Sequence, residues 1–188
     1  MNLELIGSLF YILSLFLFNR IYRMDAKKEY KFSRTKSESN IGFFKHLNKP
    51  LQIAFLLSIL FHVYQMKYLD RPFFYLEFYS QTVIQAGLAL SLIGFTLFVL
   101  GRFTLGKEYS PCYDAYTPHR VIRYGVYKYL KHPIYIGNTL YVFGAFIFSG
   151  SAVILLLFLI LGIFYLEAAR QENKELYSTP QPHDIMEN

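Results

Sequence analysis

The sequence predicts an all-α integral membrane bundle of about five transmembrane helices, with the N-terminus outside and the C-terminus in the cytosol. Hydrophobic residues make up 54% of the 188 residues, and they form long runs instead of recurring at amphipathic spacing. The net charge of +6 lies between those runs. All but two of the 19 Lys and Arg residues fall in alternate connections or in the C-terminal tail, which identifies that side as cytosolic.

Five apolar segments are expected to span the bilayer, at roughly 3–18, 51–66, 83–100, 133–148 and 151–166. Each is about 16–18 residues, or roughly 25 Å of helix, so polar and aromatic residues at the ends must reach the interfaces. Tyr11, Tyr68, Tyr79 and Tyr165 are interpreted as such anchors. The first run has no basic segment before it and no small-residue cleavage pattern after it, so we expect a retained span.

The connections predict a single membrane domain over residues 1–188. Three N-terminal spans lie within 1–100 and enclose a basic cytosolic loop at 19–50, and a cofactor region follows at 101–176. The connection Ser149-Gly150 is so short that the last two spans should form an antiparallel hairpin, 133–166. Pro180 and Pro182 end any helix in the tail, so 177–188 are expected to be flexible.

Polar chemistry gathers where the chain re-enters the membrane before the fourth span. From His119 the sequence reads HRVIRYGVYKYLKHPIYIGNTLYVFG. Pro133 suits the first position of a helix, and Gly137 permits a close approach of a ligand or a neighbouring helix. The fifth span ends with a second polar group, Glu167, Arg170, Glu172 and Glu175. Because the hairpin should bring these groups together, they predict a pocket for a charged, aromatic small molecule.

These residues resemble a known family. The segments Gly125-Val126-Tyr127 and Lys131-His132-Pro133-Ile134-Tyr135-Ile136-Gly137 resemble the "G-x-Y … R-H-P-x-Y-x-G" signature of isoprenylcysteine carboxyl methyltransferases and their prokaryotic relatives. The stretch His119-Arg120-Val121-Ile122 is similar to the preceding "H-x-L-V" element, and Glu172-Asn173-Lys174-Glu175-Leu176 resembles the "E-E-x-x-L" element. The resemblance covers roughly residues 101–176.

The resemblance implies methyl transfer from S-adenosylmethionine at the cytosolic membrane face, without a Rossmann domain. No G-x-G-x-x-G occurs in the chain, which agrees. By position, the resemblance assigns cofactor binding to His119, Arg120, Val121, Ile122, Tyr127, His132, Pro133, Ile134, Tyr135 and Glu172. Arg170 or Arg102 is expected to act as the catalytic residue that orients an anionic acceptor, such as the carboxylate of a prenylated cysteine. Because Cys112 is the single cysteine, no Cys-based zinc cluster can form, and we expect no metal.

The sequence departs from the family pattern in positions that bear on the acceptor more than on the cofactor. Lys131 replaces the Arg, Asn173 replaces the second Glu, Ala168 lies where the substrate-binding Arg of the eukaryotic enzymes would fall, and Tyr177-Ser178-Thr179-Pro180 replaces the "F-G-x-x-Y" element. A phospholipid amine or a small thiol therefore stays open as the acceptor. A non-catalytic scaffold or small transporter, and a membrane steroid reductase with a nicotinamide site, also stay open.

The expected partners are the lipid bilayer and a lipophilic or small-molecule methyl acceptor, not nucleic acid. The basic charge lies beside apolar runs, where it is typical of cytosolic loops. The expected location is the cell membrane of a bacterium or archaeon, or the endoplasmic reticulum membrane of a eukaryote.

Overall fold

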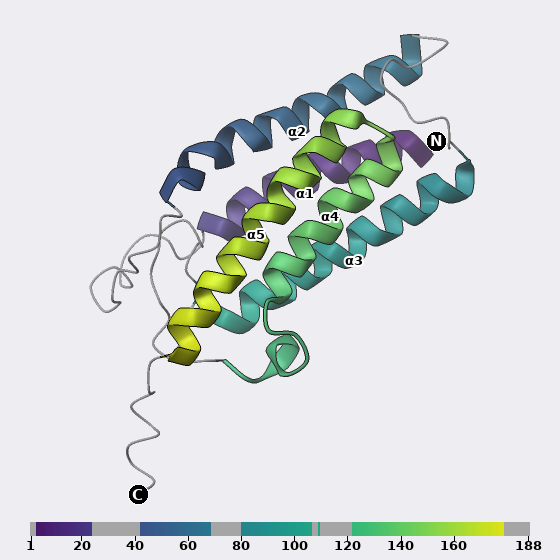
Figure 1. Cartoon of the computed structure of the whole chain (residues 1–188). Coiled ribbons are helices and arrows are strands. Elements are labelled where there is room, and N and C mark those ends of the chain that lie inside the picture. Colours follow the sequence, from purple (N-terminus) through teal and green to yellow (C-terminus); the bar gives the residue numbers. More distant parts are fainter. Residues whose placement is uncertain (1–2, 24–41, 69–79, 107–108, 110–121, 179–188) are drawn as a thin grey trace, which may run out of the picture.

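Five long helices lie side by side and alternate in direction in the computed structural model (Figure 1). The structure describes residues 3–23, 42–68, 80–106, 109 and 122–178. The elements are α1 (Leu3–Arg23), α2 (Gly42–Tyr68), α3 (Gln81–Leu105), the 3-10 turn η4 (Gly125–Lys128), α4 (Pro133–Ser149) and α5 (Ala152–Ser178). This arrangement confirms the predicted all-α bundle, while the orientation of the termini stays a prediction.

The exterior of the bundle is apolar. Within the described residues, three helical segments are long and apolar enough to cross a membrane: Leu3–Ile21, Gln81–Leu105 and Ala152–Lys174. Helix α4 is also apolar but shorter. Leu13, Phe16, Leu57, Ile163 and Leu166 are each more than half exposed on the outside of the bundle. A surface of this kind is suited to lipid, so the chain is a membrane protein, and bilayer crossing by α2 and α4 stays a prediction.

The helices extend beyond the apolar runs that predicted them. Helix α5 continues past Leu166 to Ser178, and α1 and α2 occupy both ends of the loop expected at 19–50. The remainder of that loop, 24–41, and the tail from 179 lie outside the described residues. An apolar run reflects the thickness of the hydrocarbon core, whereas backbone hydrogen bonding can continue through polar residues. The extension of α5 carries Glu172 and Asn173.

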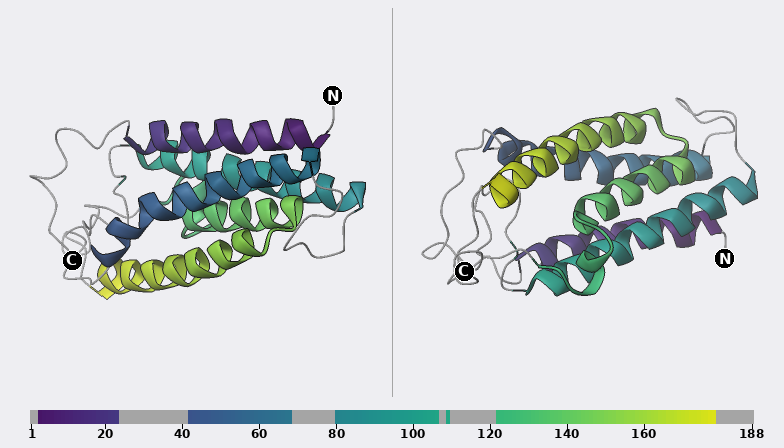
Figure 2. Two further views of the ribbon diagram at one scale, coloured as in Figure 1. Left: turned by 90° about the horizontal axis from the view of Figure 1, so that it is seen from above. Right: turned by 60° about the horizontal axis from the view of Figure 1, so that its bottom comes forward.

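The α4–α5 connection forms the predicted hairpin. Gly150 has a left-handed φ of 63°, and its N–H donates to the Phe146 carbonyl at 2.7 Å. The Ser149 hydroxyl accepts from the Ser151 N–H at 3.3 Å. A left-handed residue after the last turn is a common helix stop. The chain reverses there, so the start of α4 and the end of α5 lie at the same end of the bundle (Figure 2).

Glycines bring α3 and α4 into backbone contact. Gly87, Gly94 and Gly101 recur at every seventh residue of α3, and they face Gly137 and Gly144 of α4 or the start of α4. A Cβ atom on Gly94 would lie 2.6 Å from the Gly137 carbonyl oxygen. A Cβ atom on Gly137 would lie 2.7 Å from the Gly94 carbonyl oxygen. Small residues permit this close packing of membrane helices, and the glycine seam fixes the position of α4.

A buried hydrogen-bond network joins α1 to the glycine seam. The Tyr11 and Ser91 hydroxyls are 2.8 Å apart, and the Ser91 hydroxyl donates to the Tyr141 carbonyl at 2.9 Å. The Ser14 and Tyr141 hydroxyls are 2.6 Å apart. Tyr11 is fully buried, so the interpretation of Tyr11 as an interface anchor is wrong. Its hydroxyl has a partner inside the bundle and has no need of the water interface.

Candidate functional site

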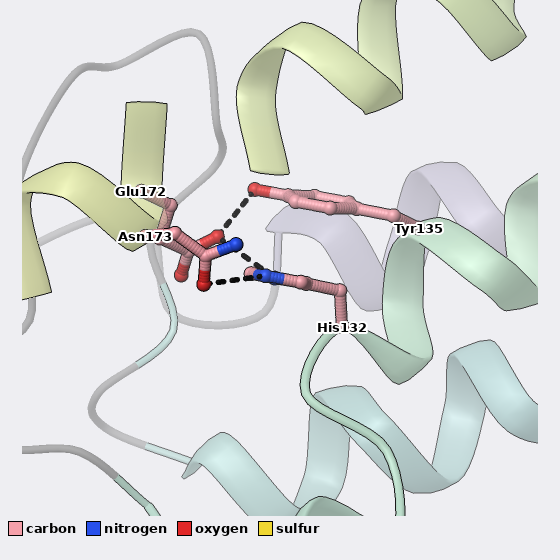
Figure 3. Close-up of polar contacts among 4 residues, drawn as sticks. All are labelled: His132, Tyr135, Glu172 and Asn173. Carbon is pink, nitrogen blue, oxygen red and sulfur yellow. Dashed lines mark hydrogen bonds and ion pairs between the residues drawn. The ribbon is translucent and has the colours of Figure 1, made fainter. Parts of the chain in front are cut away.

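Four side chains from α4 and α5 meet at one end of the bundle: His132, Tyr135, Glu172 and Asn173 (Figure 3). We call them the polar cluster. The Tyr135 hydroxyl donates to Glu172 Oε2 at 3.0 Å, and His132 Nδ1 lies 3.4 Å from the same oxygen. His132 Nε2 lies 3.2 Å from Asn173 Oδ1. The structure therefore brings together the two motifs that the hairpin was expected to join.

The start of α4 is held against α3, and this contact positions the cluster. Pro133 occupies the first turn of α4, where its fixed φ favours the helix. A Cβ atom on Gly101 of α3 would lie 2.9 Å from Ile134 and 3.3 Å from Pro133, so both side chains pack on that glycine. His132 is the N-cap residue but makes no capping bond. Its ring is on the same face as Tyr135 and reaches α5 instead.

Aromatic rings form a stack beside the carboxylate. The rings of His132 and Tyr135 are 5.4 Å apart and inclined by 9°, and those of Tyr135 and Tyr165 are 5.4 Å apart and inclined by 16°. Tyr165, Ala168 and Glu172 recur at helical spacing on one face of α5. Ala168 is 2% exposed and packs with Phe164 against Tyr135 and Tyr165. The small side chain of Ala168 is compatible with two large rings at this contact.

Glu172 controls the electrostatics of the cluster. Burial alone would lower the pKa of His132, but the hydrogen bond and charge of Glu172, with the hydrogen bond to Asn173, raise that pKa above its ordinary value. Burial raises the pKa of Tyr127 far above its ordinary value, and the Glu172 charge raises it further. Glu172 therefore favours the imidazolium form of His132, and burial together with the Glu172 charge keeps the Tyr127 phenol neutral.

Arg102 lies at the end of α3 and is 3% exposed. Its Nη1 atom donates to the Gly106 carbonyl at 3.1 Å, and its guanidinium lies 4.0 Å above the Tyr109 ring. The Arg102 charge acts to lower the pKa of Tyr127. Arg102 is therefore within electrostatic reach of the residues around Glu172. Ile122, another expected cofactor residue, is buried at 8% exposure.

Arg170 is not part of the polar cluster. Its side chain is 74% exposed, and its Nη1 atom lies 3.7 Å from Glu167 Oε2. Residues two apart on a helix do not share a face, so Arg170 and Glu172 point in different directions. The structure therefore does not bring Arg170 together with His132 and Glu172, and its expected role in orienting an anionic acceptor stays a prediction. His119, Arg120 and Val121 lie outside the described residues.

Sequence reasoning missed two contributors. Asn173 was noted only as a departure from the family pattern, yet it bonds His132. Asn138 Nδ2 donates to the Tyr165 hydroxyl at 3.0 Å. An amide inside an apolar span is a signal that could have identified Asn138, since polar groups in membranes usually have a specific partner. Tyr165 stacks on Tyr135 and accepts from Asn138, so its contacts are within the bundle and not those of a simple interface anchor.

The bundle and its polar cluster define a helical membrane protein with polar side chains gathered at one end of its helices. A family model described as phospholipid methyltransferase matches residues 82–178, slightly more than half of the chain. The chain therefore belongs to the phospholipid methyltransferase family and is a membrane methyltransferase. No match was found among curated proteins or among solved structures.

The family match confirms the resemblance at the level of the superfamily. Phospholipid methyltransferases and isoprenylcysteine carboxyl methyltransferases are in the same membrane methyltransferase superfamily. The matched residues include the glycine seam, the polar cluster and both helices of the hairpin. Members of the phospholipid methyltransferase family generally use S-adenosylmethionine.

The side chains of the cluster fit that cofactor chemically. S-adenosylmethionine carries a planar purine, ribose hydroxyls, an ammonium group and a sulfonium cation. The stacked rings of His132, Tyr135 and Tyr165 offer planar contacts, and the two tyrosine rings also attract cations. The Glu172 carboxylate can accept hydrogen bonds from hydroxyl or ammonium groups.

Proposed function

We propose that the protein transfers a methyl group from S-adenosylmethionine to the amine of a membrane phospholipid. The observation that carries this proposal is the Glu172 carboxylate, which faces His132 and Tyr135 inside the residues matched by the family model. A carboxylate beside aromatic rings stabilises a cation. The methyl donor is cationic, and the head group of an amine phospholipid is cationic at neutral pH.

When bound, S-adenosylmethionine supplies an electrophilic methyl group on a sulfonium sulfur. We assign its binding to Tyr127, His132, Tyr135 and Glu172, supported by Ile122, Pro133 and Ile134 and by the segment His119-Arg120-Val121. The Glu172 carboxylate would hold a hydroxyl or ammonium group, the His132 ring would stack on the purine, and the Tyr135 ring would lie beside the purine or the cationic sulfur. These residues act by positioning and by electrostatics, because methyl transfer needs an in-line nucleophile and little covalent help. The head-group ammonium would first lose a proton, to solvent or to a carboxylate such as that of Glu172, so that its nitrogen can form the new bond to the methyl carbon as the bond from sulfur to that carbon breaks.

The side chains of α5 that face the polar cluster indicate the chemical class of the methyl acceptor. The position of the substrate-binding Arg in the isoprenylcysteine enzymes corresponds to Ala168, which is buried against Tyr135. Arg170 is exposed and pairs with Glu167. On this face of α5, the described residues therefore present a carboxylate and an amide, Glu172 and Asn173, and no guanidinium. That charge pattern favours an amine over a carboxylate as the acceptor.

Arg102 favours a second candidate, methylation of a carboxylate such as that of a prenylated cysteine. Its guanidinium is buried at the end of α3 and acts on the pKa of Tyr127. A buried cation at that position could orient an anionic acceptor. A carboxyl methyltransferase would depend strongly on Arg102, whereas an amine methyltransferase would not use its charge to hold the acceptor.

Cofactor binding is tested by isothermal titration calorimetry of the detergent-purified protein with S-adenosylmethionine. Glu172→Gln should raise the dissociation constant by about tenfold or more, which corresponds to about 1.4 kcal/mol. Glu167→Gln is a matched control, because Glu167 lies on the same helix and pairs with the exposed Arg170. It should bind within about twofold of wild type. Equal affinity of Glu172→Gln and wild type would contradict the assignment.

The acceptor is tested with methyl-labelled S-adenosylmethionine and three acceptors, phosphatidylethanolamine, a prenylcysteine analogue and a small thiol. We expect label in the phospholipid amine. Label in a base-labile methyl ester instead, with loss of activity in Arg102→Gln, would replace the amine proposal by the carboxylate candidate. Label in the thiol alone would contradict both lipid acceptors.

A further inference from the structure

An apolar cavity of about 100 Å³ lies deeper in the bundle than the polar cluster. It is lined by α1, α2, α4 and α5 and is partly open, and the left view of Figure 2 shows α2 between α1 and α5. Its lining is mainly apolar, with residues such as Phe18, Phe55, Val142 and Leu161, and it also includes the polar residues Gln52, Asn138, Tyr141 and Tyr165. The cavity is thus built by the same two helices, α4 and α5, that carry the cluster.

The side chains on α4 and α5 change in polarity from the cluster toward the cavity. On α4, Tyr135 is followed one turn inward by Asn138 and then by Val142. On α5, Glu172 is followed inward by Tyr165 and then by Leu161. On α5 the order is ionised, then uncharged and polar, then apolar. On α4, uncharged polar side chains are followed by Val142, and the neighbouring Tyr141 directs its hydroxyl to Ser14 of α1. Glu172 and Leu161 are separated by about 16 Å along the helix at 1.5 Å per residue.

Asn138 and Tyr165 connect the cavity with the cluster. Asn138 donates to the Tyr165 hydroxyl at 3.0 Å, and both residues line the cavity. The Tyr165 ring stacks on Tyr135, whose hydroxyl donates to Glu172. Contacts therefore run from the cavity to the carboxylate without a break. The amide and hydroxyl can bond uncharged oxygens such as those of an ester.

We infer that the cavity takes the first methylene groups of one acyl chain of the acceptor phospholipid, with Asn138 and Tyr165 beside its ester oxygens. This inference deepens the proposed function and rests on it. The polarity of the lining indicates the occupant, because a phospholipid changes from a charged head group, made of an amine and a phosphate, through ester oxygens to hydrocarbon. An apolar cavity of about 150 Å³ holds a benzene molecule, so this smaller one takes a short stretch of chain and leaves the remainder in the bilayer.

Tryptophan fluorescence can detect this occupant, because the chain has no native Trp. Phe55→Trp places the only indole in the cavity lining. Phe16→Trp is the matched control, because Phe16 is 66% exposed on the outside of α1. Phosphatidylethanolamine brominated close to its esters is titrated into each variant in detergent. We expect saturable quenching of the cavity indole at about tenfold lower lipid concentration than quenching of the outer indole. Parallel quenching of both indoles would overturn the inference.

A blocking substitution tests whether the bound lipid is the acceptor. Val142→Phe adds volume to the cavity lining and should abolish the saturable quenching in the Phe55→Trp background. We expect Val142→Phe alone to raise KM for phosphatidylethanolamine about tenfold while the affinity for S-adenosylmethionine stays within twofold of wild type. Loss of quenching with an unchanged KM would show a structural lipid and overturn the acceptor assignment.

A further variant tests the Asn138–Tyr165 pair, which lies between the cavity and the polar cluster. Tyr165→Phe keeps the ring stack but removes the hydroxyl, and we expect a higher KM for the lipid with little change in kcat. An unchanged KM would limit the Asn138–Tyr165 pair to helix packing and overturn its assigned role. Failure of the proposed function is distinguishable, because wild type would then neither bind S-adenosylmethionine nor methylate the lipid. The quenching experiment requires neither cofactor binding nor methyl transfer, and it still decides whether the cavity holds an acyl chain.

Discussion

Helix α4 contacts its two neighbours in different ways. Against α3, glycines bring backbone against backbone, and a Cβ atom on Gly94 would meet the Gly137 carbonyl at 2.6 Å. Against the end of α5, α4 instead presents the long polar side chains of His132 and Tyr135. The side chains of His132 and Glu172 remain 16% and 34% exposed. The glycine seam has no space for a ligand, whereas the polar cluster is accessible to one.

The difference between the two contacts indicates that the glycine seam positions α4, whereas the polar cluster is available to bind a ligand. The seam holds the start of α4 so that the cluster residues on its other face are placed without contributing much to stability themselves. Partly exposed ion pairs contribute little, while tightly packed helix contacts resist any added volume. Substitutions in the seam should therefore affect folding, and substitutions in the cluster should affect ligand binding first.

The largest effect is expected from filling the seam. Gly94→Leu places a side chain against the backbone of α4, at a position where even a Cβ atom would collide. We expect destabilisation of about 3 kcal/mol or more, because small-to-large changes in a close-packed contact force the helices apart. The apparent midpoint of thermal unfolding in detergent, followed by circular dichroism, measures this change.

Gly162→Leu is the matched control for the seam. A Cβ atom on Gly162 of α5 would have no neighbour within 4 Å, so the same substitution should leave the midpoint close to that of wild type. If Gly94→Leu unfolds at the same temperature as Gly162→Leu, the close contact between α3 and α4 is incorrect, and the placement of the cluster loses its support.

A smaller effect is expected from the buried network beside the seam. Ser91→Ala removes the hydroxyl that bonds both Tyr11 and the Tyr141 carbonyl. We expect a loss of about 1 kcal/mol, since hydrogen bonds between membrane helices average about 0.6 kcal/mol and an orphaned phenol adds to that cost. Ser58→Ala is the control, because among the described residues the Ser58 hydroxyl bonds the carbonyl of Ala54 in its own helix and reaches no other helix. A smaller loss at Ser91 than at Ser58 would contradict a bridging role.

The bundle could be predicted from the sequence because apolar runs and the positions of basic residues report directly on a bilayer. Five helices occur where the runs were expected. Their ends could not be read from hydropathy, because α5 remains helical through Glu172 and Asn173 after the apolar run has ended. The glycine spacing on α3 was visible in the sequence, but its partners on α4 required the hairpin geometry.

The pairing of His132 and Tyr135 with Glu172 could be predicted because the hairpin brings two separated motifs together. Arg170 could not be excluded in the same way, since its exposure depends on the rotation of α5. The role of Tyr165 was missed because a tyrosine near the end of a span is typical of an interface anchor, and Asn138 was missed although an amide inside an apolar span is unusual. Only their contact, at a cavity formed by four helices, gives them a possible role.

The smallest effect concerns the pH dependence of the His132–Glu172 pair. The pKa of His132 is raised in the folded protein above its ordinary value of 6.5, because the bond and charge of Glu172 and the bond to Asn173 outweigh burial. The charge of the neighbouring Lys131 acts in the opposite direction. A raised pKa means that the folded state binds the proton more tightly than the unfolded state. The pair therefore stabilises fully below about pH 6.5, and this contribution is lost as the pH rises through the folded-state pKa.

The comparison of wild type with His132→Gln isolates this contribution, because groups that titrate elsewhere affect both proteins equally. We expect wild type to be more stable than the variant by about 0.5–1 kcal/mol at pH 6, since the pair is partly exposed, and by less at pH 8. Unfolding midpoints of both proteins at the two pH values give the difference. A wild-type advantage that is equal at both pH values, or larger at pH 8, would show that the imidazolium is not held by Glu172, and that the cluster keeps its shape by packing alone.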